Sequence, residues 1–369
     1  MEGLFERRSA DRTADGPGAV VPTAVRRALV VAECGASSGD SGLPLLPIAN
    51  RPLLLRVLDS LAGTGLREVA LAVEPMFLPR VRDVVEAGRP WHFELSYLDL
   101  SSDEGMLDAL GRWAGDGPVL LHCASCLLNV PLRPLLDEGR LDPFDAVVVV
   151  DSRPVKSRVV DLASERLAGV CGYRSSEGLG APADVAVLGS AASEVARVLE
   201  AAGHTDLDLL TLVERMAELG GRVRARPVAA CWRDSGGIDA ALEANRFVLA
   251  SLSARASGFE SRSTVVDGPA DIDGSATLER STVRGPVVVG PRTRVVDSYI
   301  GPYTSIAANV CVEGAEIENS IVLSDSRISH LGARLEGSVI GPQAKISRDF
   351  RLPRAMRLHV GEGARVSLV

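Results

Sequence analysis

The feature that most constrains the fold is a repeat of aliphatic residues in the last hundred positions. These residues recur in steps of six, six and five, so that the pattern repeats every 17 residues. The repeat produces three rows: Val266, Val283, Ile300 and Ile317; Ile272, Val289, Ile306 and Leu323; and Leu278, Val295 and Val312, with Ile328 one residue out of step. Three apolar rows joined by short turns predict a three-sided parallel β-helix, in which each coil buries its inner face on the next.

Gly-Pro pairs supply turn residues for such a coil. They stand at 285–286, 290–291, 301–302 and 341–342, where we expect them to form the corners. An antiparallel sandwich would instead need period-two alternation along longer strands, and this segment does not show it. A coil of this kind usually packs against a catalytic domain or another subunit, so we expect homo- or hetero-oligomers that assemble through it.

The preceding part of the chain, from residue 27 to about 245, alternates short apolar runs with amphipathic segments. Strands are predicted at Ala28–Ala32, Val69–Val73, Glu94–Leu98, Val119–Leu121, Ala146–Val150, Val185–Leu188 and Val223–Pro227. Helices are predicted at Leu53–Ala62, Ala191–Ala202, Asp206–Leu219 and Gly237–Leu252. This alternation indicates a mostly parallel, layered α/β sheet. Ligands of such sheets bind at the carboxyl ends of the strands, which draws attention to the loops after Ala32 and Leu121.

These patterns divide the chain into four segments. Residues 1–24 carry charge, Gly and Pro but little to bury, and we expect a disordered tail. Residues 25–245 form the predicted α/β domain, 246–262 a helical linker, and 263–369 the β-helix with a C-terminal tail.

Charge and composition exclude several classes of function. The net charge of −8 argues against a non-specific nucleic-acid binder. No apolar run reaches 18 residues, so no membrane-spanning helix is expected, and the N-terminus lacks the apolar stretch of a secretory signal. Six scattered cysteines then indicate reduced thiols in the cytoplasm.

The loop after the first predicted strand is rich in Gly and Ser but has no lysine or arginine before Arg51. Its residues 35–42 could cradle a phosphate through backbone N–H groups, or form a short surface loop. The whole chain has only two lysines, Lys156 and Lys345, so a mechanism that needs a lysine in the N-terminal half has only Lys156.

Three other features have both a chemical and a structural interpretation. Cys123-Ala-Ser-Cys126 is either a metal or redox motif or a pair of small buried apolar residues. Asp234 is either a Mg²⁺ ligand or the N-cap of the helix that follows it. Trp232 is interpreted as a packing residue and His330 as a surface residue of the coil.

Several segments resemble the sugar-1-phosphate nucleotidylyltransferases, and in particular the long form of glucose-1-phosphate thymidylyltransferase. They are PLLPIANRPLL (44–54), WRDSGGIDAALEANRFVL (232–249), GPVVVGPRTRVVDSYIGPYTSI (285–306), IENSIVLSDSRI (317–328) and RLPRAMRLHVGEGARVSLV (351–369). The resemblance implies a Rossmann-like nucleotidyltransferase domain followed by a left-handed parallel β-helix. It also implies that a sugar-1-phosphate oxygen attacks the α-phosphorus of a nucleoside triphosphate, with Mg²⁺ as cofactor.

The catalytic half departs from the family pattern. The family's Pro-Lys pair falls on Gly42-Leu43, so that a leucine replaces the lysine, and its first metal aspartate falls within Cys123-Ala124-Ser125. A later Glu-Lys-Pro motif falls near Cys171-Gly172-Tyr173. The resemblance leaves a weak metal ligand, Asp234, and a remnant of the nucleotide loops formed by Gly35, Ser37, Ser38, Gly39 and Gly105.

Two functions follow from this asymmetry, and no catalytic residue is assigned. The first is a non-catalytic homologue that serves as a regulatory or scaffold subunit and keeps a remnant nucleotide or sugar-phosphate pocket. The second is an active enzyme with a rebuilt site, in which arginines such as Arg51 or Arg80 replace the lost cations and an NDP-sugar or NDP-cyclitol is made in a secondary-metabolite pathway. Leu43 and Ala124 are expected at the pocket rim, where lysine and aspartate would restore Mg²⁺-dependent nucleotide binding.

Overall fold

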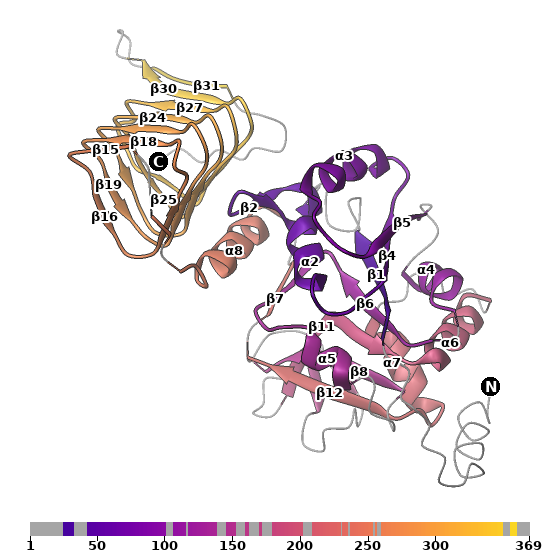
Figure 1. Ribbon diagram of the computed structural model, residues 1–369. Coiled ribbons are helices and arrows are strands. Elements are labelled where there is room, and N and C mark those ends of the chain that lie inside the picture. Colours follow the sequence, from indigo (N-terminus) through magenta and orange to yellow (C-terminus); the bar gives the residue numbers. More distant parts are fainter. Residues whose placement is uncertain are drawn as a thin grey trace. The chain divides into compact units, whose positions relative to one another are not determined.

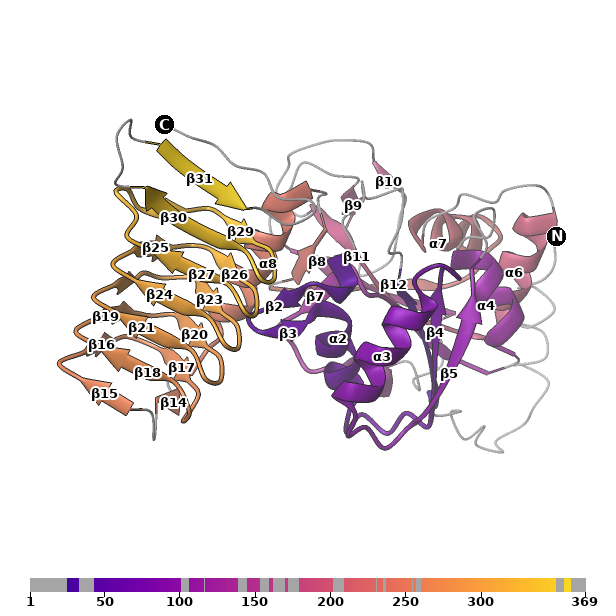
Figure 2. The ribbon, with the colours of Figure 1, turned by 90° about the horizontal axis from the view of Figure 1, so that it is seen from above.

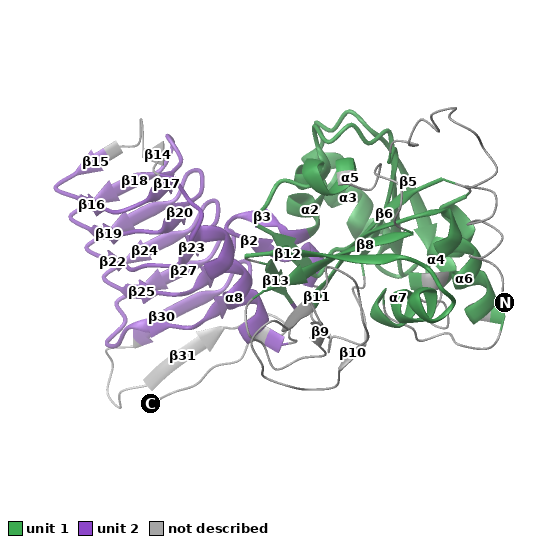
Figure 3. Ribbon diagram, turned by 90° about the horizontal axis from the view of Figure 1, so that it is seen from below, with its two compact units in different colours: residues 1–34, 54–233 green, residues 35–53, 234–369 purple. Residues whose placement is uncertain are grey.

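The computed structural model of the chain describes residues 25–32, 43–100, 106–115, 117–138, 145–152, 159–161, 170–171, 179–201, 209–229, 231–234, 237–253, 255–256, 260–349 and 355–359. It consists of two compact units (Figure 3). The first contains residues 1–34 and 54–233, and the second contains residues 35–53 and 234–369. The second unit therefore includes a short N-terminal segment, whereas the four-segment division made from the sequence stays a prediction.

A mixed sheet forms the centre of the first unit (Figure 1). Its strands lie in the order β5, β4, β1, β6, β11, β8, β12, and β9 and β10 extend it beside β11. All pairings among the first seven are parallel except those of β11. The strands are β1 (Arg27–Ala32), β4 (Glu68–Val73), β5 (Glu94–Asp99), β6 (Val119–Cys123), β8 (Ala146–Asp151), β9 (Val159–Asp161), β10 (Val170–Cys171), β11 (Leu179–Leu188) and β12 (Val223–Val228). The prediction of a mostly parallel sheet with these seven main strands is confirmed.

Among the described residues, six helices accompany this sheet: α2 (Leu53–Leu61), α3 (Leu78–Gly88), α4 (Met106–Trp113), α5 (Arg133–Glu138), α6 (Ser190–Ala201) and α7 (Leu209–Glu218). Helices α4, α6 and α7 share one apolar core with alternate residues of β1, β4, β6, β8, β11 and β12. Helices α2 and α3 pack closely, because a Cβ added to Gly88 would lie 2.6 Å from the Cδ1 atom of Leu55. The sequence predicted α2, α6 and α7 but missed α3, α4 and α5.

The second unit contains a parallel β-helix, whose stacked coils are visible in Figure 2. Strands 17 residues apart pair in parallel and form three sheets. One sheet contains β14 (Arg255–Ala256), β17 (Ala270–Ile272), β20 (Val287–Val289), β23 (Thr304–Ile306), β26 (Ile321–Val322) and β29 (Val339–Ile340). Another contains β15 (Glu260–Arg262), β18 (Thr277–Glu279), β21 (Arg294–Val296), β24 (Cys311–Glu313), β27 (Arg327–Ser329), β30 (Lys345–Asp349) and β31 (Ala355–His359). The third contains β16 (Val265–Asp267), β19 (Thr282–Arg284), β22 (Tyr299–Ile300), β25 (Glu316–Glu318) and β28 (Leu335–Glu336).

The three apolar rows stack as the 17-residue repeat predicts. Val266 pairs with Val283, Val283 with Ile300, and Ile300 with Ile317. Residues 283, 300 and 317 are fully buried, and Val266 packs against the same core from the first coil. The predicted first row is therefore confirmed.

One residue of the second row was predicted wrongly. Ile306 pairs with Val322, which is fully buried, and not with Leu323, which is half-buried. The cause is a shorter corner: the step from Ile317 to Val322 is five residues, whereas the first three coils use six. The six-residue corners contain Gly-Pro and this one does not. Ile328, which looked out of step, is consequently in register with Val312.

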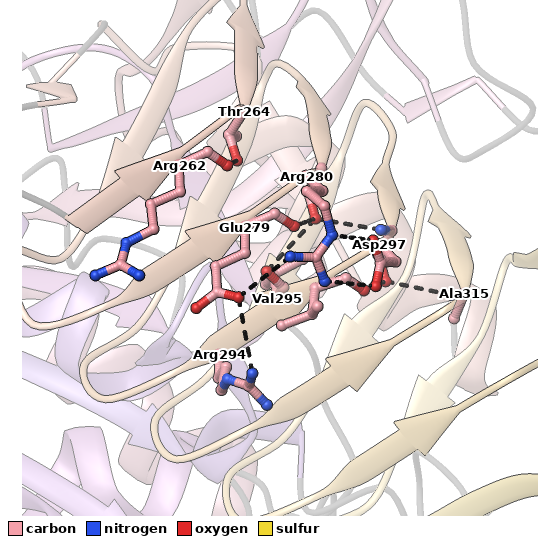
Figure 4. Close-up of polar contacts among 11 residues, drawn as sticks. Arg262, Thr264, Glu279, Arg280, Arg294, Val295, Asp297 and Ala315 are labelled. Carbon is pink, nitrogen blue, oxygen red and sulfur yellow. Dashed lines mark hydrogen bonds and ion pairs between the residues drawn. The ribbon is translucent and has the colours of Figure 1, made fainter.

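Residues in the left-handed backbone region form the coil corners. Arg280, Asp297, Gly314 and His330 occupy one such column, with φ between 46° and 58°. The Arg280 guanidinium donates two hydrogen bonds, of 2.7 and 2.8 Å, to the carboxylate of Asp297 one coil away (Figure 4). Gly314 leaves room for the next coil, because a Cβ there would lie 2.8 Å from Nδ1 of His330. The His330 side chain is half exposed, as expected of a surface residue.

The N-terminal segment of the second unit is a hairpin docked on the β-helix. Strands β2 (Pro47–Ile48) and β3 (Arg51–Pro52) are joined by Ala49 and Asn50, both at positive φ, as in a type I′ turn. The Asn50 side-chain amide donates a 2.7 Å bond to the carbonyl of Ile306. The motif PLLPIANRPLL therefore has a structural role that the sequence analysis did not assign.

Helix α8 (Gly237–Leu249) completes this junction through one buried amide. The Asn245 Oδ1 atom accepts a 2.8 Å bond from the N–H of Ala49, and its Nδ2 donates a 3.0 Å bond to the carbonyl of Tyr303. Asn245 is fully buried, and the guanidinium of Arg246 lies 5.4 Å from the Tyr303 ring centroid. One side chain thus links the hairpin, the helix and a coil corner.

Candidate functional site

The carboxyl ends of the parallel strands form one edge of the sheet in the first unit. There β1 ends at Ala32, β6 at Cys123 and β8 at Asp151. The first half of β11 lies beside them, because Val185 pairs with His122 and Ala181 with Asp151. This edge is the place where open α/β sheets bind their ligands.

The remnant nucleotide loops predicted from the sequence lie outside the described residues. This applies to Gly35, Ser37, Ser38 and Gly39, in the stretch that follows β1, and to Gly105, which directly precedes α4. The assignment of these five residues stays a prediction.

Asp234 directly follows β13 (Cys231–Arg233), which pairs with β7 (Cys126–Leu128). Its side chain is half-buried and engages neighbouring groups. Helix α8 begins three residues later, at Gly237, and Ser235 and Gly236 lie outside the described part of the chain. Both interpretations of Asp234, as metal ligand and as N-cap, therefore stay predictions. Trp232 is 6% exposed and pairs with Leu127, in keeping with a packing residue.

Two positions expected at the pocket rim lie in apolar cores instead. Leu43 is 2% exposed within a 3₁₀ helix (Leu43–Leu45) whose three residues are all buried. Ala124 is fully buried, and its N–H donates a 2.8 Å bond to the carbonyl of Val31. The rim prediction was wrong because both residues adjoin apolar runs that pack inward: Leu43 begins the buried stretch Leu43–Leu45, and Ala124 follows the buried strand β6.

A cluster of thiols and carboxylates occupies the same edge. Cys126 and Cys231 are buried, and Cys123 is half-buried at the end of β6. The Cys231 thiol donates a 3.3 Å bond to Oδ2 of Asp151, which is 4% exposed. Hydrogen bonding to Cys231, followed by burial, raises the pKa of the Cys126 thiol well above its ordinary value. Cys126 and Cys231 lie on one face of the β7–β13 ladder, and since the Cys231 thiol donates to Asp151, Cys126 is the donor of the pair.

Arg233 and Asp184 form an ion pair beside this cluster. Arg233 lies opposite Cys126 in the β7–β13 ladder. Its Nε atom is 3.2 Å from Oδ2 of Asp184, in ion-pair rather than hydrogen-bond geometry, and its Nη1 donates a 2.6 Å bond to the carbonyl of Pro182. The sequence analysis identified the Cys123–Cys126 motif but not its partners, since Cys231, Asp151 and Asp184 lie far away in the chain.

His122, next to this cluster, is a buried neutral imidazole. It is 1% exposed, and its Nδ1 atom lies 2.8 Å from the carbonyl oxygen of Cys123, so Nδ1 carries the proton. Burial lowers the pKa of His122 to about 4, against a small raising effect of that hydrogen bond. The imidazole is therefore uncharged at neutral pH and adds no cation to the sheet edge.

The donor set does not fit the Mg²⁺ that the family resemblance implies. Mg²⁺ requires oxygen ligands in octahedral geometry, whereas thiols are soft donors. The described residues contain no group of three or more His, Cys, Asp or Glu side chains placed to hold a metal ion. They also contain no helix that is long and apolar enough to cross a membrane.

Comparison with known proteins shows related sequences along most of the chain. A glucose-1-phosphate thymidylyltransferase of Streptomyces antibioticus is 26% identical over 340 residues, which cover 89% of this chain and 94% of the relative. A protein of the same name from Streptomyces griseus is 26% identical over 336 residues, with the same coverage. The low-salt glycan biosynthesis nucleotidyltransferase Agl11 of Haloferax volcanii is 27% identical over 337 residues, or 88% of this chain and 93% of the relative. No protein-family profile matches the chain.

A solved structure shares the fold. This is the structure of a Bacillus anthracis protein in complex with sucrose, and that protein is described as a putative glucose-1-phosphate thymidylyltransferase. The superposition has a TM-score of 0.52 at 13% identity and covers 59% of this chain and 93% of that one. The solved structure shows that the chain has a Rossmann-like nucleotidyltransferase fold, and by sequence the chain is similar to two glucose-1-phosphate thymidylyltransferases and one nucleotidyltransferase.

Proposed function

We propose that this chain is a nucleotidylyltransferase homologue without significant turnover, which acts as a regulatory or scaffold subunit. The observation that carries the proposal is the burial of Leu43 and Ala124, which are 2% and 0% exposed. These are the positions where the family resemblance places the lysine beside the α-phosphate and the first metal aspartate. A side chain enclosed in an apolar core contacts no substrate, so neither position contributes a charge to the sheet edge.

The effect of such losses on rate is large. Removing a single electrostatic contributor typically lowers the rate by about 10²–10³-fold. Two losses at one reacting centre do not simply add, yet together they bring the turnover close to background. The remaining candidates, Asp234 and the loop at Gly35–Gly39, do not replace the missing lysine.

The β-helix supports the structural half of the proposal. Its core is continuous from Ala270 to Ile346, and the hairpin and α8 are fixed to it by Asn50 and Asn245. We propose a left-handed coil, as in the resembled family, and oligomers that assemble through it with copies of this chain or with an active homologue. A remnant pocket for a nucleotide or sugar phosphate belongs to the same proposal, and so does a cytoplasmic location.

A pyrophosphate-release assay tests the proposal. The purified chain is incubated with each of several nucleoside triphosphates, several sugar 1-phosphates and Mg²⁺, beside the Streptomyces antibioticus relative as positive control. We expect a turnover at least about 10⁴-fold below that of the control. Light scattering in solution is expected to show an oligomer, or a complex with the control enzyme.

The alternative is an active enzyme with a rebuilt site, and the names of the curated relatives favour it. Arg80 is exposed in the first turn of α3, directly after β4, and is one candidate cation. Turnover within about 10²-fold of the control with any substrate pair would establish this alternative and refute the loss of catalysis. Substitution of Arg80 by Met, with Arg82→Met as a matched control in the same helix, would then show whether Arg80 replaces the lost lysine.

A further inference from the structure

The thiols at the sheet edge have a geometry suited to chemistry that the nucleotidyltransferase family does not explain. Cys123 ends β6, Ala124 and Ser125 form a turn, and Cys126 begins β7. The first and fourth Cα atoms of a β-turn are less than about 7 Å apart. Disulfides need Cα separations of about 4.4–6.8 Å, so Cys123 and Cys126 are close enough to be bridged.

Thiol–disulfide exchange requires one thiol that the reagent can reach and a second thiol beside it, and Cys123 and Cys126 differ in exposure in this way. Cys123 is half-buried and reachable by a small reagent, whereas Cys126 is fully buried. A small disulfide therefore meets Cys123 first. Cys126 reacts only with a group already bound to Cys123, which is the role of a resolving thiol.

A hydrogen-bonded chain leads away from the buried thiol. Cys126 and Cys231 are neighbours on one face of the β7–β13 ladder and hydrogen-bond to each other, and the Cys231 thiol donates a 3.3 Å bond to Oδ2 of Asp151. A proton can move along this chain from Cys126 to Cys231 while the Cys231 proton moves to Asp151. The carboxylate then holds a proton and Cys126 is a thiolate, without solvent entering the core.

We propose that Cys123 and Cys126 form a disulfide-exchange site for low-molecular-weight disulfides, in which Cys231 and Asp151 take up the proton of the resolving thiol. The Cys123 thiolate attacks one sulfur of the reagent, forms a mixed disulfide and releases one thiolate. Cys126, deprotonated through Cys231 and Asp151, then attacks the Cys123 sulfur and displaces the second thiolate. Two cysteine thiols are oxidised to one disulfide and the reagent is reduced to two thiolates. The proton of Cys123 passes to solvent, and the proton of Cys126 is taken up, through Cys231, by the Asp151 carboxylate.

The product is a disulfide that closes the turn between β6 and β7. It fixes the turn at the carboxyl edge of the sheet, and a small dithiol reopens it by the reverse exchange. The proposal does not depend on the loss of turnover, since it uses none of the nucleotide or sugar-phosphate residues.

The test uses the full chain with Cys34, Cys171 and Cys311 replaced by serine, and glutathione disulfide as the reagent. Mass spectrometry follows the adduct on Cys123 and the internal disulfide with time. In the otherwise unsubstituted chain we expect a short-lived adduct that converts to a Cys123–Cys126 disulfide and is reversed by dithiothreitol. A chain that stays fully reduced, or that keeps a stable adduct on Cys123 with Cys126 reduced, overturns the proposal.

A matched pair of substitutions tests the proton path. We expect Asp151→Asn to prolong the lifetime of the adduct at least about tenfold, because the asparagine amide cannot accept the proton. The control is Asp145→Asn, because Asp145 directly precedes β8, is also buried and accepts a 2.9 Å bond from the N–H of Arg222. If Asp151→Asn does not fold, Cys231→Ala interrupts the same path. Equal adduct lifetimes in the path variant and the control would refute the role of Asp151.

Discussion

The buried imidazole of His122 should make the first unit less stable in mild acid. In the unfolded chain its pKa is about 6.5, and in the folded chain burial lowers the pKa to about 4. Between these values the unfolded chain binds more protons than the folded one, so the free energy of unfolding falls as the pH falls. At pH 5 this one group removes about 2 kcal/mol, and below pH 4 the loss levels off at about 3 kcal/mol.

The assay is urea unfolding of the wild type and of His122→Gln at pH 7 and at pH 5, followed by tryptophan fluorescence. All three tryptophans, Trp91, Trp113 and Trp232, belong to the first unit, so their emission reports its unfolding alone. Carboxylates that titrate in the same range are common to both proteins and cancel in the difference. We expect the wild type to lose about 2 kcal/mol more than the variant between pH 7 and pH 5.

A matched control is His92→Gln, because His92 is exposed in the same unit. This variant should keep the full pH dependence of the wild type. If His122→Gln and the wild type lose the same free energy between the two pH values, the imidazole is protonated in the folded chain. The argument from burial would then be refuted.

Three further predictions concern buried residues. Asn245→Leu leaves the buried N–H of Ala49 and the carbonyl of Tyr303 unpaired. It should lower the unfolding free energy, measured by circular dichroism, by about 2–4 kcal/mol. A loss below about 1 kcal/mol would contradict the role of Asn245 as a junction. Val322→Ala should cost about 2 kcal/mol in the same measurement and Leu323→Ala clearly less, and the reverse order would refute the shortened corner. Ala124→Asp places a carboxylate in a fully buried position, so it should destabilise the first unit by about 3 kcal/mol or more in thermal and urea unfolding and should not create a Mg²⁺ site. Mg²⁺-dependent nucleotide binding by this variant in calorimetry would contradict this prediction.

The parts of the fold that the sequence predicted are those with a local signal. The strand at Val119–Leu121 is an uninterrupted apolar run because both faces of β6 are covered, and the rows of the β-helix repeat at a fixed spacing. Only the second half of strand β11, Val185–Leu188, was predicted. Residues 179–184 contain glycine and proline, and the direction of the strand is set by its neighbours in the sheet. Helix α4 was missed because its eight residues are too few to show the helical repeat of apolar positions.

The candidate site was harder to predict for the same reason. The Cys123–Cys126 motif is local and was identified, but its hydrogen-bonded partners come from β8 and β13, and Cys231 lies 80 residues from Asp151. Only the topology of the sheet brings them together. The expectation that Leu43 and Ala124 would face a pocket came from family resemblance, which locates positions in a chain but does not show whether they are buried.

The uneven corners of the β-helix imply a rule for how this half of the chain can change in length. The step from Ile317 to Val322 is five residues, one fewer than the equivalent step in the first three coils. The step from Ile328 to Leu335 is seven residues, whereas the equivalent step from Leu278 to Val283 is five. Both changes fall in corners, and the strands on either side keep their partners. Insertions and deletions at corners therefore alter only the local outline, whereas a single residue added within a strand would turn the following residues of that strand to the opposite face. Peptide tags or binding loops should accordingly be accepted after Ser329 and rejected within β24.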